Sequence, residues 1–216
     1  MKLLNLKKNI FKKILYLLPL SFLFNFPSHA ELKIVEFENP DVLVSNILEE
    51  ASKTMGKRVG AKDVKWMWGK EEYRCNNYDF TRGVICLAEN LKNNKFDLAF
   101  TTAHEYAHHV QWTAFNLPKT DNWREIINIV KLELQADCFA GIILGSIQNF
   151  YINPNDSTKM MELVGKFGDK KYDDLDHHGS SENRSLALRS GLKFGSSKGI
   201  IKDNYYKVFC EVDVFR

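Results

Sequence analysis

The chain has 216 residues, 44% of them hydrophobic, and a formal net charge of +3 at pH 7, which is the composition of a globular protein. Five of the 30 basic residues and none of the 27 acidic ones lie in positions 1–30, so 25 basic and 27 acidic residues give positions 31–216 a net charge of −2. This slightly acidic balance gives no electrostatic reason to expect nucleic-acid binding. Positions 31–216 contain no internal repeat and suffice for one well-cored domain.

The first 30 residues have the pattern of a secretory signal peptide. Five lysines between Lys2 and Lys13 precede an apolar run from Ile14 to Phe24, and Ser28-His29-Ala30 is a small-x-small cleavage site. The apolar run has 11 residues, fewer than the roughly 20 that span a bilayer. We therefore expect a periplasmic or secreted protein with a signal peptide (1–30) and one domain (31–216). An uncleaved anchor, which would hold the protein at the membrane, is the alternative.

The segment before residue 95 predicts one helix and then short strands. Asn39-Pro40 can begin a helix that reaches about Ser52 and ends at Gly56, with proline at the first helical position. Residues 63–90 are rich in aromatic and β-branched residues between turn formers, which is typical of strands.

All four cysteines lie beyond the predicted cleavage site, and an even number in an exported chain favours disulfides. Three pairings are possible. We favour Cys75–Cys86 with Cys138–Cys210, because Cys75 and Cys86 flank the turn-like segment Asn76-Asn77-Tyr78-Asp79. Buried free thiols are the alternative.

The next segment predicts a helix that carries two histidines. Asn94 can cap its start, Asn116 with Pro118 can end it, and apolar residues recur at helical spacing between them, at Phe96, Phe100, Ala103, Ala107, Val110 and Ala114. His104 and His108 lie one turn apart, so both imidazoles can bind one metal ion.

Glu105, beside the first histidine of this His-Glu-x-x-His motif, is placed to take a proton from a metal-activated water. Two hydrogen-bonded core histidines beside a solvated glutamate are the alternative.

A second predicted helix carries two carboxylates on one face. Asn122 and Glu125 form a capping box at its start. Glu133 and Asp137 are four residues apart, and burying them unpaired would be costly. We expect Glu133 to be the third metal ligand, with water in the fourth position, and Asp137 to hold the N–H of a ligand histidine. Small residues should let the two ligand helices approach closely, namely Ala136, Ala140, Gly141 and Gly145. A solvated acidic stripe is the alternative.

Three strings in this order resemble the bacterial putative neutral zinc metallopeptidase family: HEYAHHVQ from His104, ELQADCFAG from Glu133 and HGSSENR from His178. The resemblance covers residues 70 to 195. It implies an α+β fold, a zincin-like metallopeptidase domain with two ligand-bearing helices and a small antiparallel sheet, one Zn²⁺ per chain, and peptide-bond hydrolysis. It also makes Gly83–Leu87 the candidate edge strand that pairs with an extended substrate. An ordinary core strand is equally compatible with the sequence.

Zincins usually add a hydrogen-bond donor from outside the ligand helices, and His178 is the candidate here. It stands at the predicted start of a final helix that Ser180 can cap and that runs to about Phe194. Asp176 would favour its protonated form, and Arg184 would support the same site. We expect His177 to matter little, the loop 166–176 to cover the site, and the tail to return as a strand held by Cys210.

The sequence therefore predicts an exported zinc metallopeptidase that acts on a peptide or protein substrate, with Glu105 and His178 as catalytic residues. Two alternatives stay open: a catalytically silent, zinc-stabilised periplasmic binding or assembly module, and a zinc hydrolase of a cell-wall amide. The intact Glu105 argues against the silent module, which has no need of a base.

Overall fold

The computed structural model describes residues 39–61, 63–70, 75–114, 117–120, 122–147, 154–170, 177–197 and 210. The predicted signal peptide, Asn116, Asp176 with most of its loop, and the predicted C-terminal strand lie outside these residues. Within them, no helix is both long enough and apolar enough to cross a membrane.

The first helix, α1 (Pro40–Ala51), begins as the sequence predicts. The Asn39 side chain accepts a hydrogen bond from the Asp41 N–H, and proline occupies the first turn. The helical path does not end at Gly56 as expected: it continues through a π-helical turn, η1 (Ser52–Gly56), and α2 (Lys57–Val59). Gly60 ends it in the left-handed conformation, at φ 74°. Gly56 instead makes room for Tyr106, whose hydroxyl would overlap a Cβ at that position.

The sheet has three strands in the order β1-β3-β2: β1 (Lys65–Gly69), β2 (Asn77–Asp79) and β3 (Val84–Ala88). The expected antiparallel sheet is in fact mixed, because β1 pairs with β3 in parallel and only β2 is antiparallel to β3. The prediction that Gly83–Leu87 forms the edge was wrong. The strand β3 is central, as its four consecutive buried residues from Ile85 also indicate. The two outer strands are β1 and β2, and β2 is the edge strand that is antiparallel to β3.

Both favoured disulfides are present, Cys75–Cys86 and Cys138–Cys210. The first disulfide links Cys75, two residues before β2 begins, to Cys86 in the middle of β3. The second links positions 72 residues apart, so it holds a tail residue against the helix that carries Glu133. Cross-links over long loops restrict the unfolded chain most.

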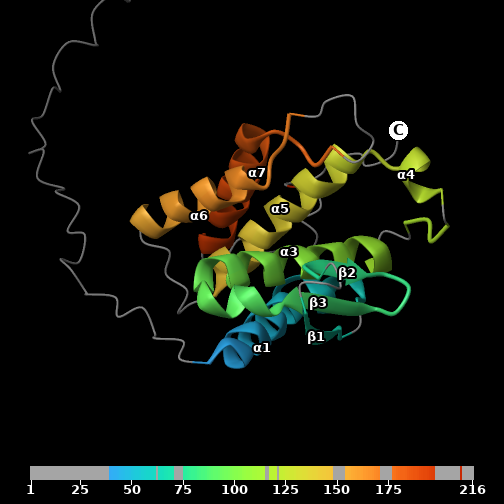
Figure 1. Ribbon diagram of the computed structural model, residues 1–216, viewed down its shortest axis with the longest axis horizontal. Helices are drawn as coiled ribbons and strands as arrows, with labels where there is room; N and C mark the ends of the chain where they lie inside the picture. The colour runs from blue at the N-terminus through green and yellow to red at the C-terminus, as the bar shows by residue number, and fades with distance from the viewer. Residues whose placement is uncertain are drawn as a thin grey trace, which may run out of the picture. The chain divides into compact units, whose positions relative to one another are not determined.

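The central helix is α3 (Lys95–Ala114), which follows a 3₁₀ turn, η3 (Glu89–Asn93). The Asn94 side chain accepts hydrogen bonds from the N–H groups of Phe96 and Asp97, which confirms the predicted cap. In Figure 1, α1 and the sheet lie on one side of α3 and the later helices lie on the other. Because α3 packs on both sides, 14 of its 20 residues are buried, and its polar motif is held in the core.

The predicted second helix is interrupted near its start. A short α4 (Trp123–Ile126) ends where Ile127 adopts an extended conformation, and α5 (Ile129–Ser146) begins after Asn128. Asn122 makes no side-chain capping bond, so the expected capping box is wrong. Asn128 is the cap instead, since its side chain accepts from the Lys131 N–H.

Two further helices complete the fold, α6 (Pro154–Lys166), which the sequence analysis did not predict, and α7 (Ser181–Ser196). Ser180 caps α7 as expected, accepting a hydrogen bond from the Asn183 N–H. Gly141 and Gly145 face α7, where a Cβ on either would press on the α7 backbone. These glycines therefore do not serve the approach of α5 to α3, and they bring α5 and α7 together instead.

Candidate metal centre

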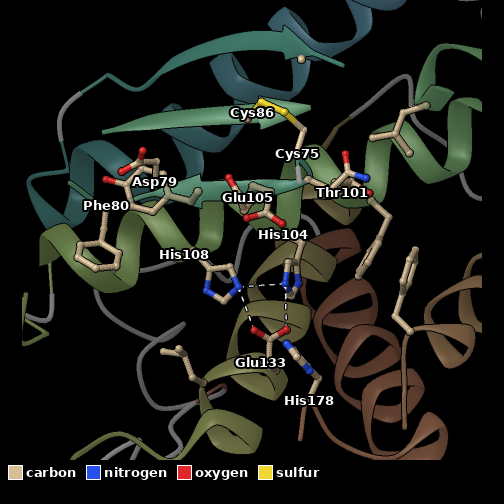
Figure 2. A pocket seen from close by; sticks show the side chains of 18 of the residues that line it. Cys75, Asp79, Phe80, Cys86, Thr101, His104, Glu105, His108, Glu133 and His178 are labelled. Carbon is tan, nitrogen blue, oxygen red and sulfur yellow. Dashed lines mark hydrogen bonds and ion pairs between the residues drawn. A yellow bond between two sulfur atoms is a disulfide. The ribbon is translucent and has the colours of Figure 1, made fainter. Parts of the chain in front are cut away.

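The two ligand helices bring three donors to one point. His104 and His108 present their Nε2 atoms 3.0 Å apart on α3. From α5, Glu133 places Oε2 3.2 Å from the His104 Nε2 and Oε1 3.3 Å from the His108 Nε2. Figure 2 shows the three side chains converging in the cleft.

The spacing fits a tetrahedral zinc ion. With zinc–ligand bonds of about 2.0–2.1 Å, neighbouring tetrahedral ligands lie about 3.3 Å apart. Two imidazoles and one carboxylate are also the donors that catalytic zinc uses with an open fourth position. Among the residues that the structure describes, His104, His108 and Glu133 are the group placed to hold a metal ion.

Each ligand histidine has a partner at its second ring nitrogen. The His104 Nδ1 lies 2.9 Å from Asp137 Oδ1, and the His108 Nδ1 lies 2.7 Å from the amide oxygen of Gln111. An acceptor at Nδ1 favours the tautomer with its proton there, which leaves the lone pair of Nε2 for a metal. Asp137 was predicted for this place from the sequence and Gln111 was not, although its three-residue step from His108 is a helical neighbour spacing.

Gln111 is itself held from both helices. Its Nε2 donates to the Leu132 carbonyl oxygen at 2.9 Å and to Gln135 Oε1 at 3.0 Å. Gln135 in turn donates to the Cys210 carbonyl oxygen at 3.2 Å. A buried amide chain therefore runs from a ligand histidine to the long-range disulfide.

Arg184, on α7, binds the carboxylates of the centre. Its Nε and Nη2 donate to the two oxygens of Asp137 at 2.7 and 2.9 Å, and Nη2 lies 3.4 Å from Glu133 Oε2. All three side chains are buried. The guanidinium therefore balances two carboxylates that would otherwise be costly to bury beside each other.

These contacts set the charge of the metal-free centre. Burial acts to lower the pKa of His104, but the neighbouring Asp137 and Glu133 carboxylates outweigh it and raise that pKa to about 10. For Glu133, burial acts to raise the pKa, and the two histidines hold it well below its usual value. Glu133 is thus an anion ready to bind a cation, and a metal ion must displace a proton from His104.

Glu105 lies at the same point of α3 but outside the donor group. It is 6% exposed and lines the cleft with the ligands. Burial raises its pKa, an effect that the two histidines and a hydrogen bond from the backbone N–H of Tyr78 partly oppose. Because Tyr78 lies on β2, the edge strand and the candidate base are in direct contact.

His178 lines the cleft on the side of α7, and Figure 2 shows it beside Glu133. Its side chain is 48% exposed, and its Nδ1 lies 3.9 Å from Asp169 Oδ2, which also accepts from the His178 backbone N–H. Asp169 is therefore a partner of His178, and Asp176, which the sequence suggested for this role, lies outside the described residues. His177, which was expected to matter little, is buried, and its Nδ1 hydrogen-bonds to Asp169.

The whole centre opens into a cleft of about 1170 Å³. The described residues of the candidate site that line it are His104, Glu105, His108, Glu133, His178 and Arg184. Asp137 lies behind this surface, fully buried. A cleft of this size can admit a substrate of several residues.

No curated protein and no solved structure matches the chain significantly. The sequence profile of one family, described as putative neutral zinc metallopeptidase, matches residues 87–199, which include both ligand helices and Arg184. This match covers more than half of the chain and implies zinc as the metal. The chain belongs to the putative neutral zinc metallopeptidase family.

Proposed function

We propose that the chain is an exported zinc metallopeptidase that hydrolyses peptide bonds. The observation that carries this proposal is a buried carboxylate, Glu105, in the same cleft as three converging metal donors but outside the donor group. A site that only stabilised a fold would need the donors and not the base. An open cleft beside them supports turnover further.

His104, His108 and Glu133 would hold the zinc ion, which lowers the pKa of a bound water towards 7 and polarises a carbonyl when it is present. Gln111 and Asp137 keep the two imidazoles in the orientation that this requires. Arg184 keeps the Asp137 carboxylate in place and neutralises part of the acidic charge.

Glu105 is proposed to accept a proton from the attacking water and to pass it to the leaving amine. Burial raises the pKa of Glu105, which makes its carboxylate a stronger base towards the attacking water than an ordinary glutamate. The hydrogen bond from the Tyr78 backbone fixes the direction of the carboxylate.

His178 is proposed to donate a hydrogen bond to the oxyanion that forms at the scissile carbonyl. Its exposure on the cleft wall beside Glu133 supports this role. Arg184 is less suited to it, because its Nε and Nη2 already bind Asp137.

Cleavage profiling of a proteome-derived peptide mixture tests this proposal. Zinc-loaded wild type should produce new peptide termini, and Glu105→Gln with equal zinc content should produce them at rates lower by about two orders of magnitude or more. Equal zinc and no cleavage by either protein would favour a silent module. Release of fragments from peptidoglycan alone would favour a cell-wall amide as substrate.

Export is also part of the proposal. Two disulfides support an oxidising compartment, where such bonds persist. Amino-terminal sequencing of the protein from fractionated cells should find a chain that begins at residue 31 outside the cytoplasm. A start at Met1 in the membrane fraction would show an uncleaved anchor instead.

A further inference from the structure

Four aromatic side chains line the floor of the cleft in single-turn steps along α3. Phe100, His104, His108 and Trp112 follow one another at intervals of four residues, and all four line the cleft. The Phe100 ring lies 5.4 Å from the His104 ring, and Trp112 lies one turn beyond His108. The metal donors therefore have an aromatic residue on either side along the helix axis.

On the His108 side, residues from three elements build a continuous aromatic wall. The Phe80 ring stacks on Trp112 with centroids 4.3 Å apart and an interplanar angle of 17°. Trp123 meets Trp112 edge to face at 5.3 Å and Phe80 at 6.3 Å. Phe80 follows β2, Trp112 lies on α3 and Trp123 begins α4, and Figure 2 shows Phe80 beyond His108 from the other ligands.

This wall is open to the cleft. Trp112 is buried beneath the other two rings, but Phe80 and Trp123 are only partly buried and, like Trp112, line the cleft. Arg124 covers part of Trp123, with its guanidinium carbon 4.5 Å from the ring centroid. Ring surface left in water beside a reaction centre is stabilised when an apolar group covers it, and most strongly when that group is aromatic.

We propose that Phe80, Trp112 and Trp123 form a subsite that binds a large apolar side chain of the substrate, preferably an aromatic one, on the His108 side of the scissile bond. This inference rests on the proposed peptidase function, since it assigns a substrate preference to that cleft. The interrupted start of α5 contributes to the subsite, because the break at Ile127 lets α4 place Trp123 against Trp112.

The opposite end of the cleft offers a matched control. There Phe167 stacks on Phe100 with centroids 5.9 Å apart, and both line the cleft on the His104 side. Phe167 is also an exposed aromatic residue. Phe167→Ala therefore removes a cleft-lining ring of the same chemistry without touching the proposed subsite.

Binding of a scanned peptide series to the zinc-loaded Glu105→Gln protein tests the inference without turnover. The probes are six acetylated hexa-alanine amides, each with one phenylalanine at a different position, and calorimetry gives each Kd. We expect one position, or two adjacent ones, to bind about tenfold more tightly than the others. Adding Phe80→Ala or Trp123→Ala should remove most of this advantage, and adding Phe167→Ala should leave it.

Zinc content and melting temperature of each variant show whether it is folded, and Phe80→Leu replaces Phe80→Ala if the latter loses zinc. Equal or undetectable binding of all six peptides would overturn the subsite. So would an advantage that survives both Phe80→Ala and Trp123→Ala, or one that only Phe167→Ala removes. If the preference is present but wild type cleaves no peptide, the subsite stands and the proposed activity fails.

Discussion

Two side chains outside the donor group orient the histidines of the candidate metal centre. Asp137 faces the Nδ1 of His104, and Gln111 accepts from that of His108. The two partners differ in charge, since only the carboxylate adds an anion to the centre. The carboxylate contact should therefore contribute to the affinity for zinc as well as to the direction of the ring.

The Asp137→Asn substitution should weaken zinc binding by about 10- to 100-fold, because it removes the anion that orients and polarises His104. Competition with a chelator of known affinity measures the change. Asp79→Asn is the matched control, since Asp79 also lines the cleft but pairs with Arg82 and Thr81. A variant at position 137 that binds zinc as tightly as wild type would contradict this role.

Zinc affinity should also depend on pH above neutrality. The pKa of His104 in the metal-free protein is raised to about 10, above the usual value of about 6.5, so the proton is bound throughout the neutral range and zinc must displace it. Affinity should thus rise about tenfold per pH unit between about pH 7 and 8.5 and should not level off there. Chelator competition across this range measures the slope. A flat profile above pH 7.5 would show that His104 is already neutral.

The adjacent histidines of the 177–178 pair should respond differently to replacement. His178→Phe should retain zinc and melting temperature but lower kcat far more than it raises KM, because its proposed hydrogen bond forms only with the oxyanion. His177→Phe should lower the melting temperature, because it removes a buried partner of Asp169. Steady-state kinetics with calorimetry separates the two. Equal, mild effects of both substitutions would show that His178 has no catalytic role.

At the scale of elements, the register of α5 determines where Glu133 and Asp137 point. The helix α5 begins at Ile129 and not at Trp123, so Glu133 lies in its second turn. The apolar spacing through Ile127, Val130 and Leu134 is compatible with either start, so periodicity alone could not locate the break. The sequence predicted a cap at Asn122, and the structure places the cap six residues later, at Asn128.

Alanine replacement of these two asparagines tests the selected start. Asn128→Ala should lower the free energy of unfolding by about 1 kcal/mol, because the Lys131 N–H loses its acceptor. Asn122→Ala should change it by less than about 0.5 kcal/mol, since its side chain caps nothing. Urea denaturation of both variants gives the comparison. A larger effect at Asn122 would return the helix start to the position that the sequence suggested.

Caps and glycines show where local sequence was sufficient. Asn39, Asn94 and Ser180 were predicted as caps and act as caps, because each side chain satisfies an N–H within three residues. Local sequence does not determine which helix packs against a face that carries glycines. Gly141 and Gly145 were assigned to the wrong neighbour because nothing in α5 itself distinguishes α3 from α7.

At the scale of the whole molecule, the sequence predicted the donors of the site better than their surroundings. His104, Glu105, His108 and Glu133 stand in short motifs whose spacing is set by one helix turn. Asp169 and the edge strand β2 depend on how distant segments meet, so motif spacing gave no indication of them. Gln111, three residues after His108 on the same helix, stands at a spacing that could have indicated it. The order β1-β3-β2 likewise needs the parallel pairing of strands that are separated in sequence by β2.

The two disulfides lie on elements that hold the base and the third ligand of the candidate site. Cys75–Cys86 secures the edge strand whose Tyr78 N–H holds Glu105, and Cys138–Cys210 lies on the helix of Glu133. Both halves of the candidate site, the base and the third ligand, are therefore braced by covalent bonds. Such bonds persist in an oxidising compartment, which is compatible with the proposed export.

Zinc content per chain, measured by mass spectrometry of purified wild type, Glu105→Gln and Glu133→Ala, tests the central claim most directly. The claim is that Glu133 completes the metal site with the two histidines and that Glu105 stays outside it. Wild type and Glu105→Gln should each bind one zinc ion, and Glu133→Ala should bind close to none. Stoichiometric zinc in Glu133→Ala, or its loss in Glu105→Gln, would contradict the assignment.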